Sequence, residues 1–447
     1  MKESKQDLEI GMDLKDFHLF SKPDKEGNRT PRDVFDRKIV DYLIEHMNLI
    51  IYNDVLYIYV NGVYIKDKDG RRIKSQIQAL MYEEFKTVIR INRVYNLLMC
   101  EYSIVVKEED LNAFPAHWVN FKNGMYDPIA DILHEHKPEY RAMNQIPHDY
   151  IVPEQEKELT FCKFLESRLS QDDCKMLYEF MATCMNVDVK FQKFMYIVGT
   201  GNAGKSKTLN YINQIIGSEN ISHIDPQNIG KRFQSAFLIQ MLLNSVSDIS
   251  SKPIEDAKLI KQLTGEDTIT AEYKGGDVFY FHNTSSMIFT ANQIPKVSGE
   301  DSNGYYRRLL IVRMNDGNYI PDLVDLINSE VSLFIYFLTR RLHDVYMRGA
   351  IFESRGSKNE VSKLRNHSDS VQEFVDMCIT ESIGMRPKKI DVFNYYEKYC
   401  QAEKLDSIGR NGFYESMQAK GFVDVIYCGY AAYKDISIST ENIYLGQ

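Results

Sequence analysis

The central part of the chain alternates short apolar runs with stretches in which apolar residues recur at every third or fourth position. Phe194–Val198 is a continuous apolar run of the kind that forms a buried strand, and the residues after it carry a helical pattern that ends at Gly217. The alternation continues to about Val345 and is typical of a parallel α/β sheet. Residues 154–187 predict two helices ahead of this sheet. The pattern predicts an α/β domain over residues 151–350.

The pattern before this domain is mixed. Residues 55–65 predict a hairpin turned at Asn61-Gly62, because this dipeptide accepts the positive φ angles of a tight turn. A helical stretch is expected from Ser75 to about Met99. Residues 1–150 are therefore expected to form an α+β unit that makes contacts and carries no catalysis.

The chain changes character again after residue 350. Residues 351–370 are polar and basic and predict a linker or a frayed helix. Residues 371–447 then predict three short helices and two apolar strands around Gly429, with the helices at 371–380, 391–403 and 412–419. This is the order of a winged helix, whose third helix enters the major groove of DNA. Positive and polar side chains gather in it: Arg386, Lys388, Lys389, Arg410, Asn411 and Lys420. Duplex DNA binding is favoured over protein contact.

A phosphate-binding motif directly follows the apolar run. The pattern G-x-x-x-x-G-K-[ST] is spelled by these residues, with Lys207 next: Gly199, Thr200, Gly201, Asn202, Ala203, Gly204, Lys205 and Ser206. The glycines allow a tight turn from strand to helix in which backbone N–H groups surround a phosphate. Lys205 is expected to contact the β and γ phosphates of ATP, and Ser206 to ligate Mg²⁺. A chance glycine-rich turn is the alternative.

Three later stretches carry polar side chains suited to a nucleotide site. MLLNSVSDIS predicts a strand ending near Asp248, a carboxylate able to hold Mg²⁺ or water. SSMIFTANQIP predicts a strand that delivers Asn292, whose amide can orient a water against the γ-phosphate. In GYYRRLLIVRM, Arg307 and Arg308 precede a strand and can reach a neighbouring subunit's nucleotide. A turn aspartate, a turn asparagine and a surface ion pair are the simpler alternatives.

A hairpin is predicted between the first two of these stretches. Residues 268–273 and 278–281 have strand composition, and the sequence KGGD that begins at Lys274 predicts the turn. In the pore of a ring-shaped motor, a lysine at such a tip can bind a DNA phosphate. A solvated turn lysine is the alternative.

Composition limits the classes of protein. The chain has 447 residues, 44% of them hydrophobic, and a formal net charge of −9, so any DNA contact must be local. Its seven cysteines contain no C-x-x-C spacing, which indicates neither a disulfide framework nor a zinc site and fits a reducing cytoplasm. No uncharged apolar run has the length of a membrane span. A soluble cytoplasmic protein without membrane contact is expected.

The ordered set of motifs resembles the superfamily 3 helicases, in the branch named after the poxvirus NTPase and the phage and plasmid primase-helicases. The resemblance runs through GTGNAGKS, LLNSVSDIS, KQLTGEDTITAEYK, SSMIFTANQIP and GYYRRLLIV, and it covers residues 35–345. Asn202 and the block from Lys261 to Lys274 look particular to that branch. Within it, the chain is similar to the replication initiator-helicases of staphylococcal mobile genomic islands.

This resemblance implies a AAA+ fold, a homo-hexameric ring with ATP between subunits, and 3′-to-5′ movement on single-stranded DNA. It implies roles for the motif residues: ATP and Mg²⁺ contacts for Lys205 and Ser206, the acid strand for Asp248, the sensor for Asn292, and the arginine finger in trans for Arg308 or Arg307. Lys274 becomes the residue that grips single-stranded DNA in the pore. Many members have two acids or a glutamate where this chain has Ser247-Asp248, which leaves the general base unassigned.

The sequence thus predicts an ATP-driven replicative DNA helicase of a mobile element or phage, which also recognises a replication origin through its C-terminal unit. The alternative is a DNA-binding switch in which ATP sets the assembly state without sustained unwinding, and the hairpin at Lys274 favours the motor. A kinase with the same phosphate loop lacks a recognisable acceptor base. The N-terminal unit has neither zinc ligands nor a metal-binding strand motif, so priming activity is expected to be absent, with a primase or another replication protein as a candidate partner.

Overall fold

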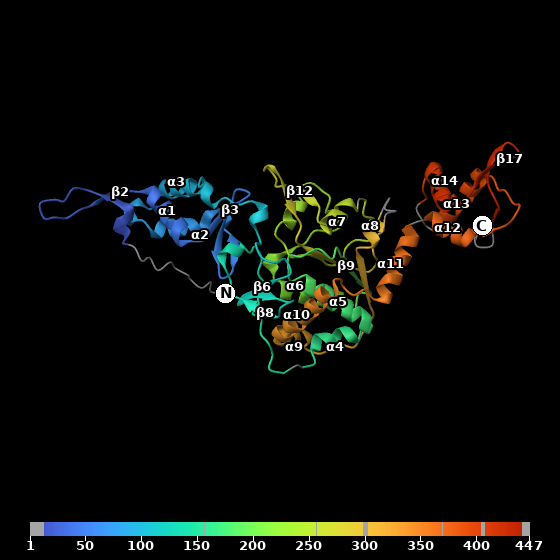
Figure 1. The fold of residues 1–447 in the computed structure, drawn as a ribbon, viewed down its shortest axis with the longest axis horizontal. Coiled ribbons are helices and arrows are strands. Elements are labelled where there is room, and N and C mark those ends of the chain that lie inside the picture. The colour runs from blue at the N-terminus through green and yellow to red at the C-terminus, as the bar shows by residue number, and fades with distance from the viewer. Residues whose placement is uncertain are drawn as a thin grey trace.

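The computed structural model of the protein describes residues 13–155, 157–255, 257–297, 303–368, 370–403 and 407–439. Three units follow one another along its longest axis: an N-terminal unit (blue), a central unit (green to orange) and a C-terminal unit (red) (Figure 1). Within the described ranges, no helix is both long and apolar enough to cross a membrane.

The N-terminal unit packs three helices on an antiparallel sheet. Its elements are β1 (His18–Phe20), β2 (Pro31–Val34), α1 (Asp36–His46), β3 (Leu49–Tyr52), β4 (Val55–Val60), β5 (Val63–Lys66), α2 (Arg71–Ala79) and α3 (Val88–Met99). The predicted hairpin is confirmed, since β4 and β5 pair around Asn61-Gly62, both at positive φ. The single helix predicted from Ser75 to Met99 is wrong. Thr87 begins a new helix there, because its side chain accepts the N–H of Arg90 at 3.2 Å as an N-cap.

The central unit is built on a five-stranded parallel sheet in the order β10-β11-β14-β9-β15. The strands are β9 (Phe194–Gly199), β10 (Ile221–Ser222), β11 (Leu243–Val246), β14 (Ser286–Ala291) and β15 (Leu309–Met314). The predicted parallel α/β core is therefore confirmed. β9 is buried on both faces: Met195 and Ile197 belong to one apolar cluster, while Phe194, Tyr196 and Val198 belong to the other.

Helices and two smaller sheets complete the central unit. The helices are α4 (Thr160–Glu166), α5 (Gln171–Thr183), α6 (Lys205–Ile216), α7 (Lys258–Leu263), α8 (Asn303–Tyr306), α9 (Leu323–Ser329) and α10 (Val331–Arg348). The smaller sheets are β6 (Val119–Phe121), β7 (Gly124–Asp127) and β8 (Ile132–His134), and the hairpin β12 (Thr268–Glu272) with β13 (Val278–His282). The first of them lies within residues 1–150, which were expected to form the N-terminal unit, but its Val119, Phe121 and Tyr126 pack in the central cluster. Apolar side chains of α4, α5, α6 and α10 share one cluster with the sheet, so the two helices predicted before β9 are confirmed as core elements.

A regular helix, α11 (Arg355–Ser368), occupies most of the segment predicted as a linker. It packs against β15, the edge strand of the parallel sheet, and leads toward the C-terminal unit (Figure 1). The Ser357 hydroxyl accepts the backbone N–H of Ile311 at 2.9 Å, and Val361 and Leu364 pack on the sheet's cluster. The helix therefore covers the open edge of the sheet.

The C-terminal unit contains the three predicted helices and the predicted strands. Its elements are α12 (Ser370–Cys378), β16 (Ile379–Glu381), α13 (Lys389–Glu403), α14 (Arg410–Ala419), β17 (Asp424–Tyr427), β18 (Tyr430–Tyr433) and β19 (Ile436–Ile438). Phe374, Tyr396 and Phe413, one from each helix, pack together in its core. Residues 404–406 and 440–447 of the predicted unit lie outside the described residues.

An ion pair with a buried carboxylate joins α5 to the end of α10. Glu179 is 0% exposed, forms an ion pair with Arg348 and accepts the N–H of Phe352 at 2.7 Å. Arg348→Ala is expected to lower the free energy of unfolding by about 3 kcal/mol, because it leaves a buried carboxylate without its counter-charge. Denaturant unfolding followed by fluorescence of Trp118, the single tryptophan, measures this. Lys163→Ala, which removes an exposed pair with Glu158, should change it by less than about 1 kcal/mol; equal losses would contradict the assignment.

Candidate nucleotide site

The predicted phosphate loop connects β9 to α6 at the carboxyl edge of the sheet. A Cβ added at Gly199 would lie 2.5 Å from the carbonyl oxygen of Met314. Gly204 has φ +91°, and a Cβ there would lie 2.6 Å from the ring of Phe164. The folded chain therefore requires glycine at both positions. Gly201 differs, since a Cβ there would meet open space, and the fold alone does not explain its glycine.

Lys205, the first residue of α6, is 4% exposed. Its ammonium donates to the carbonyl oxygens of Gly199 at 2.7 Å and Thr200 at 2.8 Å, and to Oδ1 of Asn292 at 2.9 Å. Asn292 directly follows β14, the strand beside β9. Lys205 and Asn292 are 87 positions apart in the sequence and were predicted to serve the same site. In the structure they are in direct contact. Oxygens of a bound anion can replace these neutral acceptors with stronger, charge-assisted hydrogen bonds.

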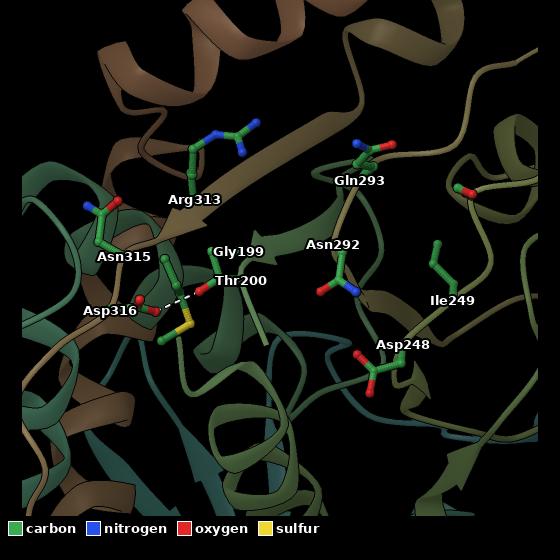
Figure 2. A pocket seen from close by; sticks show the side chains of 11 residues that line it. Gly199, Thr200, Asp248, Ile249, Asn292, Gln293, Arg313, Asn315 and Asp316 are labelled. Atoms are coloured by element: carbon green, nitrogen blue, oxygen red, sulfur yellow. Dashed lines mark hydrogen bonds between the residues drawn. The ribbon is translucent and has the colours of Figure 1, made fainter. Parts of the chain in front are cut away.

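A cavity of about 660 Å³ lies beside this contact (Figure 2). It is lined by the ends of four parallel strands and the segments after them: Gly199, Thr200, Asp248, Ile249, Ser251, Asn292, Gln293, Arg313, Met314, Asn315 and Asp316. Small-molecule sites commonly have volumes of roughly 300–1,000 Å³. The cavity therefore has room for a nucleotide, and the predicted residues Asp248 and Asn292 face it together.

Asp248 is held by the neighbouring strand. It follows β11 at φ +49°, and its N–H donates to the hydroxyl of Thr290 at 2.9 Å. The next residue, Ile249, donates its N–H to the carbonyl of Thr290, also at 2.9 Å. Two adjacent hydrogen bonds to β14 thus fix the turn from which the carboxylate of Asp248 lines the cavity.

The structure tests whether the predicted Mg²⁺ ligands suit that ion. Ser206 is exposed on the first turn of α6, with Lys207 beside it, and Asp248 lines the cavity. Among the described residues, no group of three or more His, Cys, Asp or Glu could hold a metal. Mg²⁺ commonly takes one or two protein carboxylates and fills its shell with phosphate and water oxygens. The hydroxyl of Ser206 and the carboxylate of Asp248 are suitable for such partial coordination. Their role as Mg²⁺ ligands stays a prediction.

The two candidate finger arginines have different surroundings. Arg308 is 8% exposed and donates to the carbonyl of Gly304 at 2.7 Å and to Oε1 of Gln192 at 3.1 Å. Burial lowers the pKa of Arg308, and the charge of Arg307 acts in the same direction. Arg307 is exposed. The side chain of Arg308 is buried and bonded within its own chain, whereas that of Arg307 is exposed. Arg307 is therefore better placed to reach a neighbouring molecule.

The cavity also contains charged residues that sequence analysis did not single out. Thr200 of the phosphate loop donates its hydroxyl hydrogen bond to Asp316 at 2.6 Å (Figure 2). Arg313, near the end of β15, lines the cavity and pairs with Glu360 of α11. The signal that could have found them is positional, since polar residues at the carboxyl end of a buried parallel strand lie where ligands bind.

Arg168 is a further positive charge beside the loop. It is 7% exposed, and its Nε would lie 3.3 Å from a Cβ at Gly204. Its guanidinium lies over the ring of Phe164, 4.1 Å from the centroid, and donates to the carbonyl of Asn318 at 2.8 Å. Burial lowers its pKa, yet a guanidinium stays charged in proteins. Arg168 therefore adds a positive potential that favours an anion at the loop.

The hairpin predicted around Lys274 is confirmed, because β12 and β13 pair from Thr268↔His282 to Glu272↔Val278. Lys274 is exposed at its turn, and the ring of Tyr280 is 63% exposed on β13. Cations interleaved with aromatic rings are typical of surfaces that bind single-stranded nucleic acid. The role of Lys274 in binding DNA remains a prediction.

The basic residues of the C-terminal unit are not equivalent. The side chain of Lys389 is 12% exposed and pairs with Asp424 at 2.5 Å, so it is engaged within its own unit. Lys388 lies over the ring of Tyr430, 4.5 Å from the centroid. Arg410 is exposed at the first position of α14. Lys388 and Arg410 are thus exposed, whereas Lys389 is not.

Two parts of the chain match known protein families. Residues 37–186 match the family described as D5 N terminal like. Residues 197–308, which include the phosphate loop, Asp248 and Asn292, match a family of unknown function, DUF5906. Each match covers less than half of the chain.

One viral protein is similar to the chain in sequence, and two solved structures are similar to it in fold. The chain is 24% identical over 207 residues to a protein of Acanthamoeba polyphaga mimivirus named "Putative helicase L207/L206", an alignment that covers 43% of this chain and 21% of the relative. This chain thus spans about a fifth of that protein. Two apo structures of the C-terminal region of NrS-1 are similar in fold. The first has a TM-score of 0.51 at 12% identity and covers 91% of this chain and 100% of the NrS-1 chain. The second has a TM-score of 0.50 at 13% identity and covers 88% of this chain and 97% of the NrS-1 chain. The chain is thus similar over part of its length to a viral protein named a putative helicase, and it shares its fold with the NrS-1 region.

The requirement for glycine in the loop can be tested without any ligand. Gly204→Ala is expected to lower the free energy of unfolding by about 2 kcal/mol, because alanine at φ +91° is strained and its Cβ overlaps Phe164. Gly201→Ala is the matched control and should change it by less than about 0.5 kcal/mol, since its Cβ meets open space. Denaturant unfolding of both variants measures the difference. A larger loss for Gly201→Ala would contradict the described loop conformation.

Proposed function

We propose that the chain is an ATP-driven DNA helicase of the AAA+ class that works as a homo-hexameric ring. The observation that carries this proposal is the 2.9 Å hydrogen bond between Lys205 and Asn292, beside a cavity that Asn292 and Asp248 line. A chance glycine-rich turn would not require a lysine at the start of α6 to contact an amide that follows β14, next to a carboxylate that follows β11. Phosphoryl transfer to water does require them, to bind phosphate, orient the water and hold a metal ion.

The sheet order supports the same assignment. β14, which delivers Asn292, lies between β11, which precedes Asp248, and β9, which enters the phosphate loop. Because all three strands are parallel, their carboxyl ends meet at one edge. A γ-phosphate at the loop would therefore have the amide of Asn292 beside it and the carboxylate of Asp248 one strand further away.

The chemistry of the site follows from these positions. On ATP binding, the ammonium of Lys205 would exchange the carbonyls of its own loop for phosphate oxygens, which stabilises the charge that develops during transfer. Asn292, released from Lys205, would be free to orient the attacking water. Mg²⁺, held by Ser206 and Asp248 when bound, would neutralise phosphate charge. Arg307 of an adjacent subunit would supply the finger in trans.

The DNA contacts of the proposed motor lie away from this cavity. Lys274 at the β12–β13 turn would bind the backbone of single-stranded DNA in the pore, with Tyr280 offering a stacking surface. The C-terminal unit, with helices α12, α13 and α14 followed by the β17–β18 hairpin, fits a winged helix. Its third helix begins at the exposed Arg410 and would enter the major groove of origin DNA.

The decisive experiment is strand displacement on a 3′-tailed and a 5′-tailed DNA fork with ATP. The wild-type protein should unwind the 3′-tailed fork. Lys205→Ala should lose both ATP hydrolysis and unwinding by more than about a hundredfold, because it removes the ammonium that stabilises the charge developing on the phosphates during transfer. Unchanged ATP turnover in Lys205→Ala would refute the site. ATP hydrolysis without unwinding of either fork would favour an ATP-controlled DNA-binding protein instead.

The two arginines predict different outcomes. Arg307→Ala subunits mixed into wild-type protein should reduce ATPase activity more steeply than their fraction, because each removes a group from its neighbour's site, while their own thermal stability stays unchanged. Arg308→Ala should instead lower thermal stability, because it removes a guanidinium that is 8% exposed and bonded within the chain. ATPase activity strictly proportional to the wild-type fraction in the Arg307→Ala mixture would argue against catalysis in trans.

A further inference from the structure

Arg313 has an unusual position for a residue of a parallel strand. Its neighbours Val312 and Met314 are buried in the core, whereas its side chain is 53% exposed and lines the cavity. Successive side chains of a strand point to opposite faces, so Arg313 projects on the face where α11 packs. An arginine at the mouth of a phosphate-binding cavity is suited to bind phosphate, because its planar guanidinium donates two parallel hydrogen bonds.

The strand register places Arg313 next to the phosphate loop. It is paired with Val198, the residue immediately before Gly199, in the β9–β15 ladder. Neighbouring strands lie about 4.8 Å apart. On the other side of β9, Val198 is paired with Ala291, the residue before Asn292. Arg313 and Asn292 therefore flank the start of the loop from opposite sides.

Glu360 of α11 holds the guanidinium in the described conformation. The Nε of Arg313 donates to Oε2 of Glu360 at 3.1 Å, and a second nitrogen donates to the same oxygen. Oε1 of Glu360 accepts from Lys363 at 3.1 Å. Burial acts to raise the pKa of Glu360, but the hydrogen bonds from Arg313 and Lys363 outweigh it and the pKa is lowered, so the carboxylate is ionised and paired.

This pair connects the cavity to the helix that leads to the C-terminal unit. α11 is fixed to β15 by Ser357 and by apolar contacts of Val361 and Leu364, and it is followed directly by α12. A half-exposed ion pair stabilises a fold only slightly. A purely structural role is therefore a weak explanation for a pair whose arginine faces a cavity with phosphate-binding geometry.

We propose that Arg313 contacts the phosphates of the nucleotide bound in its own subunit, and that Glu360 competes with the nucleotide for this guanidinium. The inference rests on the proposed ATP site. Binding of nucleotide breaks the ion pair between Arg313 of β15 and Glu360 of α11, and the loss of this pair transmits the nucleotide state toward the C-terminal unit. By linkage, Glu360 lowers nucleotide affinity, because part of the binding free energy is used to separate the pair.

Nucleotide affinities of five proteins test the competition. Isothermal titration calorimetry with the ATP analogue AMP-PNP and Mg²⁺ on the full chain should give a Kd about threefold lower for Glu360→Gln and about tenfold higher for Arg313→Gln than for wild type. In the double variant, Glu360→Gln should have no further effect. Glu353→Gln is the matched control: it removes one carboxylate that pairs with Lys193 at 2.7 Å outside the cavity lining and should leave the Kd unchanged.

Each outcome has one meaning. A lower Kd for Glu360→Gln in the Arg313→Gln background would show a general charge effect and overturn the competition, as would equal gains from Glu353→Gln. Wild-type protein that fails to bind AMP-PNP would refute the proposed function itself. Wild-type binding with no effect of Arg313→Gln would refute this inference alone.

Hydrogen exchange gives an independent readout of transmission. In wild type, backbone amides of α11 around Glu360 should exchange faster when AMP-PNP is bound, because the helix loses its contact with Arg313. In Arg313→Gln, exchange in α11 should be independent of the nucleotide at saturation. Nucleotide-dependent exchange that persists in Arg313→Gln would overturn the role of this pair.

Discussion

The structure of the central unit depends on how a buried ammonium is satisfied. Lys205 is 4% exposed, and burying a charge without hydrogen-bond partners is among the most unfavourable events in folding. Its acceptors come from the loop that begins at Gly199 and from Asn292. One side chain thereby ties the start of α6 to the ends of β9 and β14. The loop closes around its own lysine, which keeps the acceptors of that lysine in place for exchange with an anion.

Local signals explain most of what could be predicted of the fold. Hairpins and the parallel core are encoded in short patterns, such as Asn61-Gly62 or a continuous apolar run, and both are confirmed. The glycines after β9 do connect a strand to a helix as expected, and phosphate binding by that turn stays a prediction. The segment 351–370, predicted as a linker or a frayed helix, is a regular helix over Arg355–Ser368 for a physical reason. Its helix α11 has a narrow apolar stripe, with Val361 and Leu364 among polar neighbours, and it is stabilised by the edge of β15, which sequence alone does not place beside it.

Predicting the site was harder where tertiary burial decides a residue's role. Lys205 and Asn292 come from motifs and meet as expected. Arg307 and Arg308 are adjacent and chemically identical, and only the packing around Gln192 and Gly304 shows that Arg308 is committed to its own chain. Arg313 carries no motif. Its place in the cavity follows from the pairing of β15 with β9, a long-range register that a single sequence does not reveal.

The charges around the cavity are balanced in the described conformation. Lys205, Arg168 and Arg313 lie at or beside it, and carboxylates of similar number accompany them: Asp248, Asp316 and Glu360. A polyphosphate entering this site meets little net attraction unless it brings a cation or displaces a carboxylate. Asp316 accepts a hydrogen bond from Thr200 of the loop, and the backbone of Asp248 is bonded to β14. Neither carboxylate can therefore move away without disturbing the loop or the sheet. Glu360 alone among these carboxylates lies on a helix, α11, rather than on a loop that forms the cavity. It is therefore the charge that can move away without unfolding the loop.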